Sequence, residues 1–316
     1  MEKLKIGNLV LKNRLFLSPM VDVTDVAYRL ICRNAGASVA YTEMLHVEAI
    51  IHGGENVEKK MITSNKEKPV GIQITAKKAI DIKPVINKLE KFDLIDINCG
   101  CPSHLTIDHG SGSYLLKEPK KIGEMIKLLK DKTDKPITAK IRLGLKKNNV
   151  LKTAKIIEKA GADLLTVHAR LANQGRGIPA NWNELKKLKK QIGIPLVGNG
   201  DIFNAVKAGE MLDICDGVMI ARGALGNVNI FSDCIYYFRT GKEREFNLKK
   251  NIKYFLEYLR LLKKYEIINI GRIKYVGSHF IKDFEGAAKK RGEFMKLKNY
   301  EEIMWFFEEL YKNINN

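Results

Sequence analysis

The sequence has no apolar run long enough to cross a bilayer, and its first residues, Met1 to Lys5, lack the apolar core of a secretory signal. We therefore expect neither a membrane span nor export. Cysteine is scarce, and the five cysteines are odd in number and scattered, which argues against a disulfide framework and favours a reducing cytoplasm. No second cysteine pair complements Cys99 and Cys101, so we expect no metal site.

Acidic residues are also few. The chain has 36 Asp and Glu against 55 Lys and Arg, which gives a formal net charge of +19 at pH 7. A surplus of this size favours a polyanionic partner, with nucleic acid first and an anionic membrane surface second. A Lys-rich surface that reflects an AT-rich genome is the alternative without a partner, and the many Ile and Asn residues agree with it.

The sequence does contain short apolar runs that alternate with amphipathic segments such as Ala79–Lys91, Lys120–Asp131, Val150–Ala160 and Trp182–Lys190. This alternation predicts a parallel sheet. Eight repeats of run and helical segment that end near residue 230 match the length of a (β/α)8 TIM barrel, and an open doubly wound sheet is the alternative. The runs are Leu15–Ser18, Val39–Glu43, Val70–Ile74, Leu94–Asn98, Ile137–Ile141, Leu164–His168, Pro195–Asn199 and Gly217–Ala221.

From about residue 240 the strand signals become sparse, and helical patterns run through Asn247–Lys264 and Tyr300–Tyr311. We predict a catalytic barrel over residues 1–240 and a small domain of three or four helices over residues 241–316. A basic helical module beside a barrel mouth would form a groove suited to an RNA backbone. A solvated charged face is the plainer interpretation of the same residues.

Polar side chains gather where the predicted strands end. Since the carboxyl ends of all barrel strands surround one mouth, we expect these side chains to form one cavity. Glycines and a cation after the last two strands predict a phosphate site there. Cys101 taken alone is either a reactive thiol or a small core residue. The strand-end residues are Ser18-Pro19-Met20, Glu43, Gln73, Asn98 with Cys101, Lys140 with Arg142, His168 with Arg170, Asn199-Gly200-Asp201 and Ala221-Arg222-Gly223.

Further short motifs accompany these strand ends. They are Gly7-Asn8, Val23-Thr24-Asp25, Tyr41-Thr42-Glu43-Met44, Asn98-Cys99-Gly100-Cys101-Pro102 and Gly110-Ser111-Gly112-Ser113-Tyr114-Leu115-Leu116. In combination and order, the motifs and strand ends resemble the tRNA-dihydrouridine synthases, flavoenzymes that reduce specific uridines in tRNA. The resemblance covers roughly Ile6 to Phe231 and extends more faintly into the helical C-terminus.

The resemblance implies the ligands and the roles of the strand-end residues. FMN would lie across the barrel mouth, NADPH would be the reductant and tRNA the substrate. Cys101 would be the proton donor, and Asn98, with Arg170 nearby, would help to hold the uracil. The residues implied for the flavin are Ser18, Pro19, Met20, Gln73, Lys140 and His168, and those for its phosphate are Asn199, Gly200, Asp201, Ala221 and Arg222.

The chemistry of uracil agrees with these roles. Hydride addition to C6 leaves C5 in need of a proton from the opposite face, and a cysteine thiol, with a reference pKa of about 8.5, is mostly protonated at neutral pH. Lys140 would stabilise negative charge on a reduced flavin. A base within folded tRNA must be splayed out to reach such a site. We expect the Gly-rich loop over residues 99–116 to act as a lid.

Several positions depart from the family pattern. Ser18 stands where Ala is common and Thr106 where Val is common. Leu171-Ala172 replaces a Thr-Arg pair, and Arg176 stands where Tyr is frequent, so the side chain that orients the base there stays open. Cys99 occupies a variable position, where we expect it to serve in packing.

Two other functions fit part of the pattern. The first is an FMN barrel enzyme that acts on a free small molecule, such as a dihydroorotate-type dehydrogenase, but the +19 charge and the helical extension argue against it. The second is an RNA-binding barrel without chemistry, and the presence of Cys101, Asn98 and Lys140 argues against that.

Overall fold

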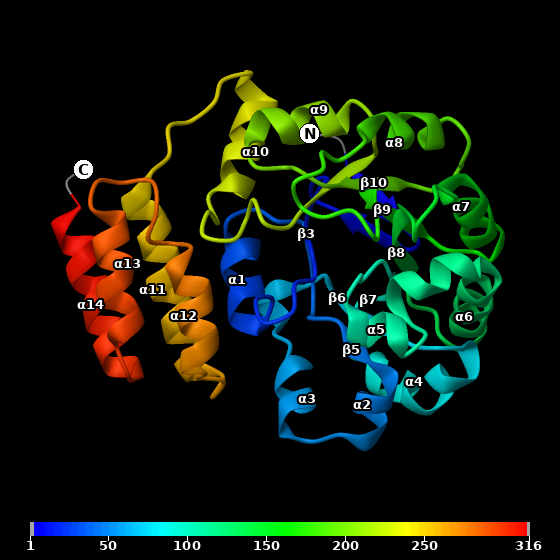
Figure 1. Ribbon diagram of the computed structural model, residues 1–316, viewed down its shortest axis with the longest axis horizontal. Helices are drawn as coiled ribbons and strands as arrows, with labels where there is room; N and C mark the ends of the chain where they lie inside the picture. Colours follow the sequence, from blue (N-terminus) through cyan, green and yellow to red (C-terminus); the bar gives the residue numbers. More distant parts are fainter. Residues whose placement is uncertain (1–2, 315–316) are drawn as a thin grey trace.

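The computed structural model describes residues 3–314 and contains a closed barrel of parallel strands (Figure 1). β3 pairs with β4 and β11, and β4 also pairs with β6, so the sheet closes on itself. The predicted TIM barrel is therefore confirmed, and closure excludes the open sheet. The barrel strands are β3 Leu15–Leu17, β4 Val39–Tyr41, β6 Val70–Thr75, β7 Leu94–Cys99, β8 Ile137–Gly144, β9 Leu164–Leu171, β10 Leu196–Asn199 and β11 Gly217–Ile220, with the short β5 Leu45–His46 beside β6.

Helices connect the strands on the outside of the barrel. They are α1 Val26–Asn34, α2 Val47–His52, α3 Glu55–Lys60, α4 Ile86–Leu89, α5 His104–Asp108, α6 Pro119–Lys132, α7 Val150–Lys159, α8 Trp182–Lys189, α9 Ala205–Leu212 and α10 Ile230–Thr240. Three 3-10 helices join them: η1 Asn65–Glu67, η2 Ala79–Val85 and η3 Gly112–Lys117. The amphipathic segment Ala79–Lys91 is divided between η2 and α4, because Pro84 lies inside it and has no N–H for a continuous helix.

An apolar hairpin closes one end of the barrel. β1 Leu4–Ile6 and β2 Leu9–Leu11 pair through a turn at Gly7, whose φ is +54°. The hairpin packs on an apolar layer of inward-facing strand residues: Phe16, Val39, Tyr41, Leu94, Leu164, Val197 and Met219. Leu94, Val39 and Leu164 are the first residues of their strands. The hairpin therefore covers the end of the barrel where the strands begin, and the end where the strands finish is the open mouth.

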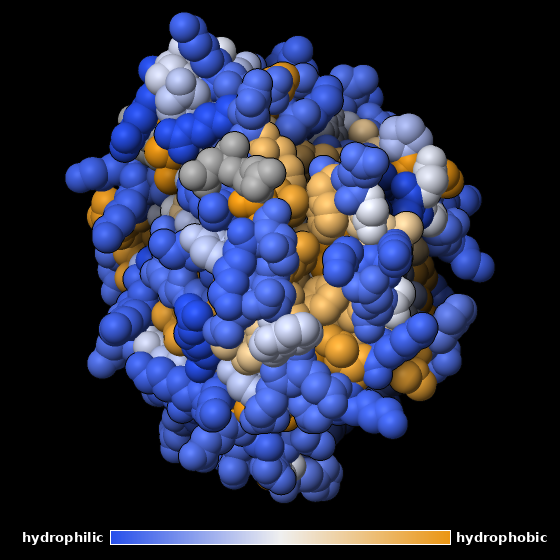
Figure 2. Space-filling model, turned by 90° about the vertical axis from the view of Figure 1, so that its left-hand side faces the viewer, coloured by the Kyte–Doolittle hydropathy of each residue, from blue (hydrophilic) through white to orange (hydrophobic). Residues whose placement is uncertain are grey.

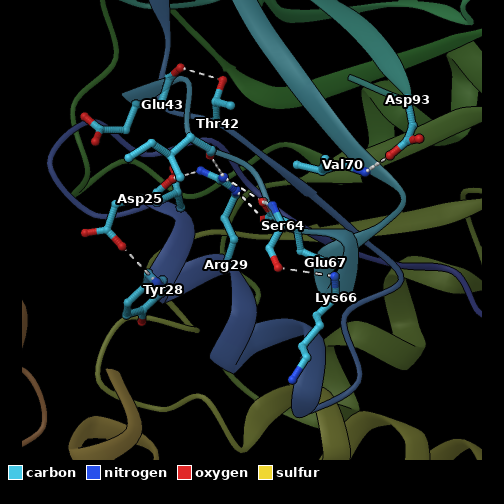
Figure 3. A network of polar contacts seen from close by, with 12 residues as sticks. Asp25, Tyr28, Arg29, Thr42, Glu43, Ser64, Lys66, Glu67, Val70 and Asp93 are labelled. Atoms are coloured by element: carbon cyan, nitrogen blue, oxygen red, sulfur yellow. Dashed lines mark hydrogen bonds and ion pairs between the residues drawn. The ribbon is translucent and has the colours of Figure 1, made fainter. Parts of the chain in front are cut away.

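A buried ion pair fixes helix α1 to the loop before β6 (Figure 3). The Arg29 guanidinium, which is fully buried, donates to Glu67 at 2.7 and 2.9 Å and to the carbonyl of Thr24 at 2.8 Å. Glu67 also caps η1 by accepting from the backbone N–H of Ser64. Because both charges are paired and hydrogen-bonded, the arrangement tolerates burial that an isolated charge would not.

Within residues 3–314, four helices follow α10, with α11 packed on α1 and α13 and α14 on the side away from the barrel (Figure 1). They are α11 Leu248–Lys264, α12 Ile270–Ser278, α13 Ala287–Lys296 and α14 Tyr300–Asn313. Phe255, Phe280, Phe294 and Phe307 are fully buried and in ring contact, so the aromatic stripe forms the core of this helical segment. The predicted helical C-terminus is confirmed, whereas a domain boundary after residue 240 stays a prediction.

The helical segment joins the barrel through buried polar contacts. Asn251 accepts from the N–H of Val228 and donates to the carbonyl of Gly226 at 2.7 Å. Tyr258 donates to Asp25 at 3.2 Å. The outer surface on this side is mostly hydrophilic, with an apolar band between polar residues (Figure 2). Within residues 3–314, no helix has both the length and the apolar character that a membrane span requires.

Candidate active site at the carboxyl ends of the strands

Inward-facing side chains change from apolar to polar toward the open end of the barrel. The register places Gln73 opposite Asp96, Asn98 opposite Lys140, and His168 opposite Asn199. Side chains at alternate positions of a strand share a face, so these residues point into the barrel above the apolar layer. The polar side chains that end the predicted strands therefore gather at one end of the barrel.

Cys101 lies on the loop after β7 and is partly exposed. Its N–H donates to Asn98 Oδ1 at 2.9 Å, and its carbonyl accepts from the N–H of Ser113 at 3.0 Å. Its Sγ lies 3.6 Å from the hydroxyl of Thr106 on α5. The thiol is thus held at the barrel mouth from both sides of the loop. Cys99, by contrast, is fully buried, in keeping with the packing role expected for it.

Asn98 links the Cys101 loop to the barrel interior. Its Oδ1 accepts from the N–H groups of Gly100 and Cys101, while its Nδ2 donates to Gln73 Oε1 at 2.8 Å. One amide hydrogen of Asn98 remains for a ligand. The side chain therefore positions the thiol loop in addition to any contact with substrate.

The chain of hydrogen bonds continues to Asp96, which the sequence analysis missed. Asp96 accepts from Gln73 Nε2 at 2.7 Å and from the Thr138 hydroxyl at 2.6 Å. Burial raises the pKa of Asp96 to about 6. The sequence did contain a signal for Asp96, an acidic residue within the apolar run Leu94–Cys99. An acidic side chain is rarely buried without a specific partner.

Lys140 is a cation on β8 among the polar side chains of the mouth. Its Nζ lies 3.4 Å from Asn199 Oδ1, and Asn199 Nδ2 donates to the carbonyl of Met219 at 2.8 Å. Burial and the neighbouring Arg142 lower the pKa of Lys140 to about 8. Lys140 is therefore mostly charged at neutral pH and becomes neutral just above it.

His168 is a neutral hydrogen-bonding group. Burial and four surrounding cations lower its pKa to about 2. Its Nε2 lies 3.1 Å from Nη1 of Arg170. Because Arg170 can only donate, Nε2 of the neutral ring accepts, and the ring proton is on Nδ1.

The guanidinium of Arg170 is almost fully buried and engaged by the protein. It donates from one nitrogen to both oxygens of Asp201, at 2.7 and 2.6 Å, and from Nε to the carbonyl of Ile178. These bonds favour a positioning role over the substrate contact predicted for Arg170. The substrate contact of Arg170 stays a prediction. The third guanidinium nitrogen, Nη1, lies beside His168 Nε2.

A small cleft lies after β10 and β11, lined by His168, Asn199–Phe203, Met219 and Ala221–Gly223. Gly200 has a φ of +122°, and a Cβ there would lie 2.9 Å from Ala180 Cβ. A Cβ on Gly223 would lie 2.1 Å from the carbonyl oxygen of Ile202. Arg222, partly exposed, adds a positive charge 3.5 Å from Asp201. Asp201 also lines the cleft, and its carboxylate is paired with Arg170 and Arg222, so the phosphate site predicted here would rest on Arg222 and the loop backbone.

Ser18, Pro19 and Met20 follow β3 at the same end of the barrel. The N–H of Ser18 donates to the carbonyl of Ile220 at 2.8 Å, and the N–H of Met20 donates to the Thr24 hydroxyl at 3.0 Å. Pro19 and Met20 are partly exposed. The structure therefore brings the predicted flavin residues to one mouth.

Comparison with known proteins identifies the family. The model of the family described as "Dihydrouridine synthase (Dus)" matches residues 16–314. The chain belongs to the dihydrouridine synthase family. Membership confirms the resemblance seen in the motifs and the expectation of an oxidoreductase.

Several members of the dihydrouridine synthase family match over most of their length. A probable tRNA-dihydrouridine synthase of Aquifex aeolicus is 33% identical over 262 residues, 80% of this chain and 81% of the relative. Probable tRNA-dihydrouridine synthase 1 of Synechocystis is 31% identical, over 95% of this chain and 86% of the relative. tRNA-dihydrouridine synthase B of Shewanella oneidensis is 30% identical, over 98% and 100%.

Solved structures with the same fold are more distant. Histamine dehydrogenase from Rhizobium sp. 4-9 has a TM-score of 0.56 at 15% identity, covering 82% of this chain and 50% of that one. The 6-hydroxypseudooxynicotine amine oxidase of Pseudomonas geniculata also has a TM-score of 0.56, at 13% identity over 76% of this chain and 49% of that one. At these identities the likeness supports the barrel fold alone.

Proposed function

We propose that this dihydrouridine synthase family member reduces the C5=C6 bond of a specific uridine in tRNA, with FMN as cofactor, NADPH as reductant and Cys101 as proton donor. The observation that carries the proposal is the Cys101 thiol at the open end of the barrel, held by Asn98 opposite Lys140. The relatives of Synechocystis and Shewanella oneidensis, which overlap most of this chain, carry the name tRNA-dihydrouridine synthase, which supports tRNA as the substrate.

The residues at the mouth fit FMN. The backbone cradle at Gly200 and Gly223, with Arg222 beside it, suits the terminal phosphate. Lys140 and the neutral ring of His168 suit the carbonyl and nitrogen atoms of the isoalloxazine ring, because one offers charge and the other a neutral donor. Gln73, Asn199 and the segment Ser18–Met20 complete the predicted contacts. The chemistry that FMN supplies when bound is hydride delivery to C6 of the uracil.

The protein's own part in the reaction is to protonate C5. The thiol of Cys101 would donate this proton, and the hydroxyl of Thr106, 3.6 Å from Sγ, would hold the sulfur in place. The free amide hydrogen of Asn98 would bind a uracil carbonyl and fix the base under the thiol. Lys140 would stabilise the negative charge that develops on the ring system during reduction.

The helical segment supports a large polyanionic substrate. A groove between the barrel and α12 is lined by Val21, Asp22, Asn269, Gly271, Arg272 and Tyr275, and Tyr275 is 47% exposed. Because Arg272 in this groove is paired with acidic residues of the barrel, attraction for an RNA strand would come from the overall charge of +19, and the groove would accommodate the strand beside a splayed-out base. We propose residues 241–316 as the tRNA-binding domain, and the cytoplasm as the compartment.

The experiment uses bulk tRNA from cells that lack this gene. The protein is incubated with that tRNA, FMN and NADPH, and dihydrouridine is mapped by mass spectrometry. We expect conversion at defined positions, loss of conversion without FMN, and tRNA binding that weakens steeply with added salt. Reduction of free pyrimidines with no conversion in tRNA would support the small-molecule dehydrogenase instead, and a protein unable to bind FMN would contradict the proposal.

A further inference from the structure

Three side chains with metal-ligand chemistry meet beside the Cys101 loop. His46 ends β5, Glu48 lies in the first turn of α2, and His109 follows α5. One ligand atom from each lies within 4.8 Å of the other two. His109 is 61 positions from Glu48 in the sequence, so a local sequence pattern does not bring it to the other two residues.

The carboxylate of Glu48 is incompletely satisfied by the protein. His109 Nε2 lies 3.3 Å from Glu48 Oε1, and the rings of His46 and His109 are 5.4 Å apart at an angle of 75°. Among the described residues, Glu48 Oε2 is buried and has no hydrogen-bond partner. A shielded carboxylate oxygen without a donor costs free energy, and a bound cation would remove that cost.

The ligand set selects the kind of cation. Two imidazoles and one carboxylate are typical of Zn²⁺ and related transition metals, whereas Mg²⁺ and Ca²⁺ prefer oxygen ligands throughout. About 40% of the His109 side chain and 35% of the Glu48 side chain are exposed, so an ion can enter and water can occupy a fourth position. We propose that His46, Glu48 and His109 bind one Zn²⁺ ion.

The ion would fasten the loop that carries Cys101 to the edge of the barrel. β5 pairs with the end of β6, where His46 lies opposite Thr75. His109 is joined through α5 to Thr106, whose hydroxyl contacts the Cys101 sulfur. A metal bridge from His109 to His46 would therefore restrict the segment that presents the thiol. The Glu48–His109 contact alone would give a weaker, charge-dependent link.

The test is a calorimetric titration of chelator-treated, full-length protein with ZnCl2 at neutral pH. We expect one Zn²⁺ per chain and an affinity loss of more than tenfold in each of the variants His46→Ala, Glu48→Gln and His109→Ala. His104→Ala is the matched control, because His104 is exposed on the same loop and should leave binding unchanged. Folding of each variant is checked by circular dichroism.

Two further measurements separate this site from the cysteines and from loose surface binding. Co²⁺ substituted at the site should give no sulfur-to-metal charge-transfer absorption, since no thiolate is among the three ligands. Proteolysis within residues 104–112 should slow when Zn²⁺ is added to the native protein and not to His109→Ala. Absence of stoichiometric binding by the folded native protein, or unchanged binding by both histidine variants, would overturn the proposal.

Discussion

Arg272, on α12 of the helical segment, lies 3.0 Å from the carboxylate of Glu43, which follows β4 of the barrel. The same guanidinium lies 3.2 Å from Asp25, the residue that caps α1. Glu43 and Asp25 are almost fully buried, and burial raises the pKa of Asp25 while Arg272 opposes that rise. One cation from the helical segment therefore pairs with two buried carboxylates of the barrel, and Lys60 of the barrel also contacts Glu43, at 3.1 Å.

This contact predicts that Arg272→Met destabilises the whole chain. The substitution keeps much of the side-chain length but leaves two buried carboxylates without their shared cation, which costs about 3 kcal/mol. This loss of stability is measured as the decrease in the free energy of unfolding in urea. Arg260→Met is the control, because Arg260 is exposed and 3.8 Å from Glu308, so its loss should cost less than about 1 kcal/mol. Equal effects in both variants would show that the pair does not join the two parts.

The two neighbouring cysteines should behave differently. Cys101→Ala removes the proposed proton donor, and we expect dihydrouridine formation to fall at least 100-fold while bound flavin is retained. Cys99→Ala removes a fully buried sulfur on the opposite face of β7 from Asn98 and should change stability by about 1 kcal/mol and activity little. Single-turnover oxidation of reduced flavin by tRNA measures both. The reverse ranking would mean that Cys101 is not the donor.

Lys140 predicts a pH dependence of FMN affinity. Its pKa of about 8 means that the cation is lost as the pH rises from 7 to 9, while the FMN phosphate is already a dianion above pH 7. We therefore expect affinity to fall over this interval, as followed by quenching of flavin fluorescence. Lys140→Met should bind about tenfold more weakly at pH 7 and lose this dependence. Lys187→Met, at a side chain 69% exposed, is the control and should titrate like the native protein.

The close packing at Gly112 leads to a prediction about the position of the Cys101 thiol. Its φ is +58°, and a Cβ there would lie 2.5 Å from Thr106 Cγ2 and 2.9 Å from the Cys101 carbonyl oxygen. Gly110 also has a positive φ of +77°, but its Cβ would meet only the flexible side chain of Lys77, at 3.2 Å. Both alanine substitutions cost about 1 kcal/mol in backbone strain. Only Gly112→Ala should lower kcat by tenfold or more, and similar rates for the two variants would contradict this.

Most of the barrel could be predicted because its signals are local. Each of the eight strands is a short apolar run with a polar residue at its end, and the helix over Asn247–Lys264 has a capping Asn and an apolar stripe. The hairpin of β1 and β2 was missed because no helix follows either strand, so neither belongs to the alternation of strand and helix that predicted the barrel. Gly7-Asn8 between alternating residues was the available turn signal.

The remaining features depend on contacts between distant segments. The Asp25–Arg272 pair and the His46–His109 cluster have no local pattern, since each side chain alone is an ordinary polar residue. The ion pair between Arg170 and Asp201 likewise forms because β9 packs against β10 and the loop that follows it. The spacing of residues along the chain predicts which side chains reach the mouth. It does not predict which of those side chains are already hydrogen-bonded to other protein groups.

The separation of Asp25 and Arg272 along the chain, 247 residues, has a consequence for biosynthesis. The ribosome delivers both acidic partners long before the arginine that neutralises them. Until α12 emerges, Asp25 lacks this cation, and its carboxyl group either takes up a proton or stays open to water. The last quarter of the chain is thus needed to finish the part that is made first.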